Sequence, residues 1–270
     1  MADLTPEEHK ERFEKIYLRN QAPAMKSVER CAFGCDYGAT SWANRDEADE
    51  LIKLLELAPG KRLLDVGAGS GWPGLYMAQT SGCDIALVDV PLSGLRIAAE
   101  RAIEDNLPGE CWVAAADGAY LPFAGDCFDA ISHSDVLCCL IEKRAVLESC
   151  RRVIRPGGRM VFSVIYVESG LSSDEYRRAV AAGPPFVETD TRYPVLLAET
   201  GWNVIAERDV TAEFASMIQR QLDVDREQRD GMESVMGATD YTDRQSSYES
   251  KFKAVSDRIL RRSLFLTAPA

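Results

Sequence analysis

Residues 63–74 read LLDVGAGSGWPG and place four glycines and one acidic residue within twelve positions. The stretch RLLDV at 62–66 predicts a short buried strand, and residues 71–80 predict a helix. A strand that turns directly into a helix exposes the unpaired amides of that helix at the carboxyl edge of the sheet, where open α/β sheets bind ligands. Glycine at positions 67, 69 and 71 would let a ligand touch the backbone. The stretch therefore predicts a ligand-binding loop.

Apolar segments alternate with helical segments after this loop. Helices are predicted over residues 95–104 and 142–153, and strands over the segments DIALVDV (84–90), CWVAAA (111–116), CFDAISHS (127–134) and PGGRMVFSVIY (156–166). Such alternation is typical of a parallel sheet covered by helices on both faces. The fold class predicted is α/β with a doubly wound, mostly parallel sheet.

The two ends of the chain add further elements to this core. Thr5, Pro6 and Glu8 form the pattern of a capping box with a first-turn proline, which predicts a helix toward Asn20, and a second helix is expected over residues 22–31. The segment 193–211 predicts a helix followed by a strand, and SLFLTA at 263–268 predicts a final antiparallel strand at the edge of the sheet. We expect four parts, namely an N-terminal helical lid (1–58), a ligand-binding core (59–211), a helical cap (212–262) and the last strand (263–270).

The composition excludes several classes of protein. The chain has 270 residues, a formal net charge of -12 and a sequence pI near 4.8, which disfavour a general nucleic-acid or anionic-membrane binder. The sequence has no run of eighteen apolar residues, so a cytoplasmic protein is expected. The eight cysteines contain no CxxC pair, which predicts reduced thiols and no metal site.

Two classes of ligand fit a glycine-rich loop. A dinucleotide fold needs GxGxxG directly after the strand, but the third glycine of that register falls at Trp72. A second register, through Gly69, Gly71 and Gly74, begins two residues late. Asp65 would also place a carboxylate near phosphates, whereas a ligand with an ammonium group would be attracted to it.

The segment LLDVGAGSGWPG resembles the first motif of class I S-adenosylmethionine-dependent methyltransferases. In that family the loop cradles the methionine part of the cofactor, and the acidic residue helps to position it. The segment ALVDVP resembles the end of the second strand of the same family, where a carboxylate accepts hydrogen bonds from the ribose hydroxyls. The resemblance implies that these two segments contact S-adenosylmethionine through Asp65, Gly67, Ala68, Gly69, Gly71, Asp89 and Val90.

Two later segments extend the resemblance to residues 61–165. AAADGAYLPFAGDCFDAI resembles the family segment that holds the adenine, which implies that Asp117 meets the adenine amine and that Gly118 lies beside the ring. ESCRRVIRPGGRMVFS resembles the following helix, turn and fifth strand. Four motifs in the family's order imply a seven-stranded Rossmann-like methyltransferase fold.

The segments FGCDYGATSW and SDVLCCL resemble the phosphoethanolamine and sarcosine methyltransferase branch of the family. By that resemblance Tyr37, Ser41 and Trp42 close over the cofactor, although Tyr37 and Trp42 could instead only pack the N-terminal helices. The chain departs from the branch in two places. Cys139 stands where a histidine is usual, and SVIY stands where an acidic residue and a tyrosine are expected after the fifth strand.

Catalytic residues are expected after the fourth strand, beside the methyl group that would be transferred. His133 is one of two histidines and is predicted to contact the cofactor or to act as a base, with a core histidine as the alternative. Asp135 is predicted to hold a cationic amine, with a helix N-cap as the alternative. His9 is expected in solvent. Phe214, Met217 and Tyr241 are candidates to line the acceptor pocket from the cap, with packing between helices as the favoured alternative.

The function predicted is methyl transfer from S-adenosylmethionine to a small-molecule acceptor, with an amine as one acceptor class. The sequence has no NPPY or DPPY after the fourth strand, which disfavours a nucleic-acid base as acceptor. Two alternatives stay open, an NAD(P)-dependent Rossmann oxidoreductase and a catalytically silent S-adenosylmethionine-binding protein. The oligomeric state is not predicted.

Overall fold

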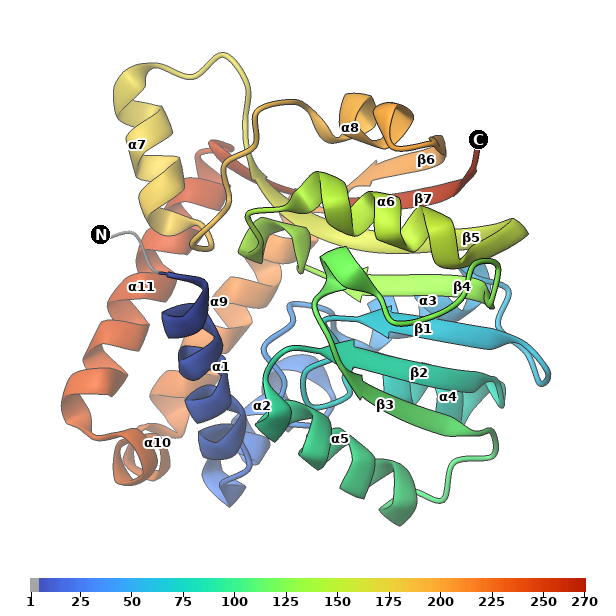
Figure 1. Cartoon of the computed structure of the whole chain (residues 1–270). Helices are drawn as coiled ribbons and strands as arrows, with labels where there is room; N and C mark the ends of the chain where they lie inside the picture. Colours follow the sequence, from blue (N-terminus) through green and yellow to red (C-terminus); the bar gives the residue numbers. More distant parts are fainter. Residues whose placement is uncertain (1–4) are drawn as a thin grey trace.

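A seven-stranded, mostly parallel sheet organises the computed structural model, which describes residues 5–270 (Figure 1). Strands β1 to β5 pair in parallel, and β7 pairs antiparallel with both β5 and β6. Across the sheet the order is β3 (Cys111–Ala115), β2 (Asp84–Asp89), β1 (Arg62–Val66), β4 (Phe128–Ser134), β5 (Ile154–Val167), β7 (Leu260–Pro269) and β6 (Trp202–Asp209). The predicted fold class is confirmed.

The last strand lies inside the sheet, so its predicted edge position is wrong. β7 is inserted between β5 and β6, and it begins at Leu260, within the segment that we assigned to the helical cap. Seven of its ten residues are buried, whereas β6 is exposed at every position after Trp202. The more apolar strand takes the interior position because both of its faces can then be covered.

Side-chain alternation along the strands divides the core into two layers. Leu63 faces helices α3 (Arg45–Leu54), α4 (Gly74–Ser81) and α5 (Leu92–Glu104), whereas Leu64 faces the layer that contains α6 (Lys143–Val153), α7 (Ser173–Ala182) and α8 (Tyr193–Glu199). Both leucines are fully buried, which contributes roughly 1.5–3 kcal/mol each. Helix α7 was not among the predicted elements.

The remaining helices gather at the end of the sheet where the parallel strands finish (Figure 1). Helix α1 (Pro6–Asn20) begins with the predicted capping box of Thr5 and Glu8. Helix α2 (Pro23–Phe33) packs on α9 (Thr211–Glu227) and α10 (Arg229–Met236), which precede α11 (Ala238–Ser256). The N-terminal and cap segments therefore form one layer over the carboxyl ends of the strands.

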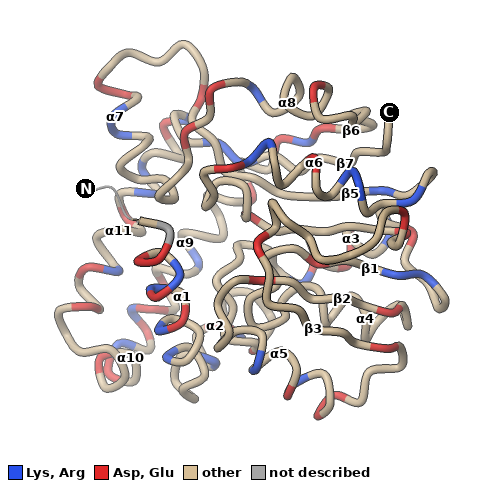
Figure 2. The backbone as a smooth tube through the Cα atoms, in the orientation of Figure 1, with Lys and Arg blue, Asp and Glu red and all other residues tan. Residues whose placement is uncertain are grey.

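Acidic and basic residues are interspersed along the outer helices, as α1 illustrates (Figure 2). Within residues 5–270, the structure has no helix that is long and apolar enough to span a bilayer.

Candidate active site

A cavity of about 510 Å³ opens at the carboxyl ends of β1, β2 and β4, under helix α1. Its floor is built by the loop after β1, by the ends of β2 and β4, and by the segment after β3. Its cover comes from α1 and from three loops, at residues 39–42, 139–142 and 184–186. A ligand in this cavity would lie at the sheet edge that the sequence predicts.

The glycines of the loop after β1 make room for the cavity and for its cover. Gly67 and Gly69 adopt φ of 69° and 53°, which favour glycine. A Cβ at Gly69 would meet the Tyr17 hydroxyl at 2.6 Å, and one at Gly67 would meet the Val136 side chain at 2.5 Å. Substitution at either position would therefore push α1 or the loop after β4 away from the cavity floor.

Asp65 is a buried carboxylate at the cavity floor. It is 2% exposed, and its Oδ1 accepts a hydrogen bond of 2.7 Å from the Ser132 hydroxyl. Its Oδ2 makes no hydrogen bond of regular geometry within residues 5–270, but it faces the backbone of Gly74 at the start of α4, whose amide helps to lower the pKa of Asp65. Burial raises the pKa of Asp65 to about 7, although the Ser132 hydroxyl lowers it. A cationic ligand would stabilise the ionised form.

Asp89 and Asp117 lie at the ends of the next two strands. Gly69 N and Val90 N each donate to the Asp89 carboxylate at 2.7 Å, which fixes that carboxylate against the glycine loop. Burial raises the pKa of Asp89 to about 6. The Asp117 side chain accepts from Ala119 N at 2.9 Å and caps a short 3-10 helix, η1 (Gly118–Tyr120).

Most of the predicted site residues are brought together at this cavity. Its lining includes Ser41, Trp42, Asp65, Gly67, Ala68, Gly69, Asp89, Val90, Asp117, Gly118 and Asp135. Tyr37 and Gly71 lie behind the lining. The Arg101 guanidinium stacks over the Tyr37 ring at 4.0 Å, and Gly71 forms the turn in which its amide donates to Ala68 O at 2.8 Å.

His133 does not line the cavity, contrary to its predicted place beside the cofactor. Ser132 hydrogen-bonds to Asp65 and Ser134 hydrogen-bonds to Ser41, so both serines lie on the cavity side of β4. Because side chains alternate along a strand, His133 points to the opposite face. There its ring stacks on Phe162 at 4.5 Å, and neither ring nitrogen has a partner within residues 5–270. Burial lowers the pKa of His133 to about 3. This position gives no support to the predicted role as a base.

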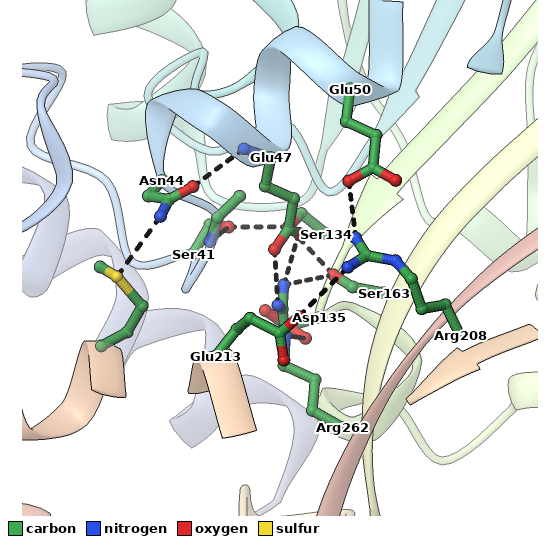
Figure 3. A network of polar contacts seen from close by, with 12 residues as sticks. Ser41, Asn44, Glu47, Glu50, Ser134, Asp135, Ser163, Arg208, Glu213 and Arg262 are labelled. Atoms are coloured by element: carbon green, nitrogen blue, oxygen red, sulfur yellow. Dashed lines mark hydrogen bonds and ion pairs between the residues drawn. The ribbon is translucent and has the colours of Figure 1, made fainter. Parts of the chain in front are cut away.

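Asp135 is held by a buried arginine at the cavity wall (Figure 3). Arg262 Nε donates to Asp135 Oδ1 at 2.9 Å, while Asp135 Oδ2 has no hydrogen-bond partner in the described part of the chain. The following short helix η2 (Leu137–Cys139) has Val136 at its N-cap and no side-chain cap. The alternative interpretation of Asp135 as an N-cap is therefore wrong.

Helix α1 supplies cavity residues that the sequence analysis missed. His9, Phe13 and Tyr17 all line the cavity, and they recur every four residues, which places them on one helix face. The His9 ring packs edge-on against Phe13 and Phe186, so its expected place in solvent is wrong. The i, i+4, i+8 spacing is the signal that could have found this face.

The cap contributes to the cavity only indirectly. Phe214, Met217 and Tyr241 are absent from the lining within the described residues. Phe214 instead packs edge-on against Trp42, with ring centroids 5.2 Å apart, and Trp42 forms part of the wall.

The fold and the motifs define a class of protein. Residues 64–162 match the family model described as a methyltransferase domain. The chain has the fold of the class I S-adenosylmethionine-dependent methyltransferases, and the match to the family model lies within the core of that fold. The site fits the cofactor of this class, because the glycine cradle has no room for side chains and the carboxylates of Asp65 and Asp89 line the cavity beside it.

Several named proteins are similar to this chain. It is 26% identical over 249 residues to phosphoethanolamine N-methyltransferase 1 of Zea mays, covering 92% of this chain and 49% of that protein. It is 29% identical over 167 residues to 27-O-demethylrifamycin SV methyltransferase of Amycolatopsis mediterranei, covering 60% of this chain and 61% of that protein.

A solved structure of Haemonchus contortus phosphoethanolamine N-methyltransferase 2, with phosphomonomethylethanolamine and S-adenosylhomocysteine, aligns with a TM-score of 0.79 and 18% identity. The alignment covers 95% of this chain and 60% of that chain. The chain thus spans about half the length of the curated phosphoethanolamine methyltransferases that it matches.

Proposed function

We propose that the protein is an enzyme that transfers a methyl group from S-adenosylmethionine to a small-molecule acceptor. The observation that carries this proposal is the pairing of a glycine cradle with two carboxylates at neighbouring strand ends, the buried Asp65 and the half-buried Asp89. A dinucleotide would bring phosphates to this acidic floor, which disfavours the oxidoreductase alternative.

The charges of the cofactor suit the floor of the cavity. S-adenosylmethionine carries an ammonium and a sulfonium, and the Asp65 carboxylate lies in the cavity lining directly before the glycine loop. We propose that Asp89 accepts hydrogen bonds from the ribose hydroxyls and that Asp117 and Gly118 hold the adenine. The cofactor would supply the methyl group, and the chain would align the acceptor with it and exclude water.

The acceptor is proposed to be an amine. Within residues 5–270 the wall and the cover of the cavity carry three acidic residues, Glu7, Asp135 and Glu142, and one lysine, Lys10, so the acceptor side of the cavity is acidic. The maize relative is named as an N-methyltransferase, whereas the name of the Amycolatopsis relative indicates an oxygen acceptor. The relatives therefore do not settle the acceptor atom, and the amine rests on the charge of the cavity. Asp135 is the residue proposed to hold it.

Calorimetry on the purified chain tests the cofactor. We expect S-adenosylhomocysteine to bind and NADH not to bind, and Asp89→Ala to weaken S-adenosylhomocysteine binding at least tenfold. Glu100→Ala is the matched control, because Glu100 is an exposed acid on α5 outside the cavity. Tight NADH binding without S-adenosylhomocysteine binding would overturn the proposal.

Turnover separates the enzyme from a silent binding protein. Methyl-labelled S-adenosylmethionine should transfer label to at least one acceptor in a panel of small amines, alcohols and phosphoethanolamine. Binding of the cofactor with no transfer across the panel would favour the silent alternative. A cytoplasmic location stays a prediction from the polar N-terminal segment and the lack of a long apolar run, and the exclusion of nucleic acid as acceptor stays a prediction from the missing NPPY or DPPY motif and the acidic composition.

A further inference from the structure

A buried arginine links three parts of the molecule at the cavity wall (Figure 3). Arg262 of β7 is 1% exposed. Its Nε donates to Asp135 Oδ1 at 2.9 Å, its Nη1 and Nη2 donate to the two oxygens of Glu47 at 2.7 Å each, and Nη2 also donates to Ser163 Oγ at 2.8 Å. Glu47 lies on α3, so the arginine joins the N-terminal layer to the sheet.

The cluster contains one cation for two carboxylates. Arg262 stays protonated, because Asp135 and Glu47 raise its pKa despite the opposing effect of burial. The other buried cation near Asp135 is Lys251, which donates to Ala182 O at 2.9 Å and makes no ion pair with Asp135 within residues 5–270. The three ion-paired groups therefore carry one net negative charge, and Asp135 Oδ2 has no hydrogen-bond partner within residues 5–270, while Lys251 interacts with Asp135 through its charge alone.

Three serine hydroxyls connect the loop at residues 39–42 to the residues around Arg262. Ser41 Oγ lies 2.8 Å from Ser134 Oγ, which lies 3.2 Å from Ser163 Oγ. The loop that carries Ser41 and Trp42 is therefore tied to the residues that hold Asp135. The adjoining wall is apolar, with Trp42, Phe13 and Phe186.

We propose that Glu47 and Arg262 are positioning residues that leave one uncompensated negative charge at Asp135, so that the cavity selects a protonated amine on an apolar body over the matching alcohol. Arg262 orients Asp135 through Oδ1 and leaves Oδ2 for the ligand. Glu47 offsets the charge of Arg262 without lining the cavity. A buried unpaired charge is costly, and a cationic ligand removes that cost. This inference rests on the proposed function, in which the cavity holds cofactor and acceptor together.

The test measures binding of 2-phenylethylamine and 2-phenylethanol, which differ at one polar group, to protein saturated with S-adenosylhomocysteine. The wild type should bind the amine at least tenfold more tightly than the alcohol. Glu47→Gln keeps the shape of the side chain and removes its charge, so it should lower this ratio at least threefold and leave the affinities for the alcohol and for S-adenosylhomocysteine unchanged. Glu47→Asp keeps the negative charge, so its ratio of amine affinity to alcohol affinity should be closer to the wild-type ratio than that of Glu47→Gln.

Glu50→Gln is the matched control. Glu50 lies on the same helix and pairs with Arg208 at 2.6 Å, outside the cavity (Figure 3). It should leave the ratio unchanged. Equal wild-type binding of amine and alcohol, no amine binding at all, or an equal loss of both ligands in Glu47→Gln would overturn the inference. Failure of S-adenosylhomocysteine to bind would instead overturn the proposed function.

Discussion

The raised pKa of Asp65 makes cofactor affinity depend on pH. Burial raises this pKa to about 7, and a cationic ligand binds the ionised form. The ionised fraction falls as pH falls through 7, so the Kd for S-adenosylmethionine should rise about tenfold between pH 8 and pH 6. Calorimetry at both pH values measures this change. Asp65→Asn should bind more weakly with a flatter profile, and an unchanged wild-type Kd would contradict the prediction.

His133 is expected to affect stability more than chemistry. Burial lowers its pKa to about 3, whereas an unfolded imidazole titrates near ~6.5. Between these values the unfolded chain binds a proton that the folded protein does not, so the free energy of unfolding falls by ~1.4 kcal/mol per pH unit as the pH falls. Between pH 7 and pH 5 the free energy of unfolding should therefore fall by ~2 kcal/mol less in His133→Phe than in the wild type. Urea unfolding at both pH values measures this difference.

The same variant tests the role expected from the sequence. If His133 lies in the core, as the structure places it, His133→Phe should keep turnover within about threefold, since Phe can stack on Phe162 in its place. Loss of turnover to background, with the cofactor still bound, would restore His133 as a catalytic candidate.

The sequence predicted the place of those site residues whose position depends only on a local motif. Asp65, Gly67 and Gly69 are fixed by the turn after β1, and all three line the cavity. His133 depends on which face of β4 it occupies. Ser132 and Ser134 could have indicated that face, because alternate residues share it. The role of Arg262 could not be read, since its partners lie 127 and 215 positions away.

At the scale of elements, one carboxylate of α1 joins that helix to the start of α5 beside the cavity. Leu92 N and Ser93 N, at the start of α5, each donate to a different Glu14 oxygen at 2.7 Å. Glu14 thereby caps the neighbouring helix and interacts favourably with its dipole. The position of α1 over the glycine loop depends on this contact.

Glu14→Gln should therefore loosen α1. The amide presents one acceptor oxygen in place of two, and a lost hydrogen bond costs about 1 kcal/mol. We expect S-adenosylhomocysteine to dissociate about fivefold faster, as measured by stopped-flow. Glu11→Gln, at an exposed position on the same helix, is the control. Equal dissociation rates in the two variants would show that Glu14 does not hold α1 closed.

Elements with a strong local pattern were predicted well. The bounds predicted for β1 are those observed, and the capping box placed the start of α1. Helix α7 was missed although Ser172 and Glu175 form a second capping box. The place of β7 between β5 and β6 is set by pairing between distant segments, which local periodicity does not encode.

At the scale of the whole molecule, the cavity lies between the N-terminal layer and the sheet. A ligand that contacts both should therefore stabilise the entire chain. A ligand at a hundred times its Kd adds ~2.7 kcal/mol to the free energy of unfolding. For a chain of this size that corresponds to a rise in Tm of roughly 5–10 °C. Differential scanning fluorimetry with S-adenosylhomocysteine should show this rise and NADH should not. A shift with NADH alone would favour the oxidoreductase alternative.

The aromatic wall also gives the molecule an optical reporter. Of the four tryptophans, Trp42 and Trp72 border the cavity, and Trp42 stands edge-on to Phe214 across the boundary with the cap. Indole emission responds to the polarity and mobility of its surroundings, so filling the cavity should change the spectrum without any added label. Trp42→Phe would remove the contribution of the tryptophan that contacts the cap and leave that of Trp72, so the difference between the two spectra reports the change at the boundary with the cap.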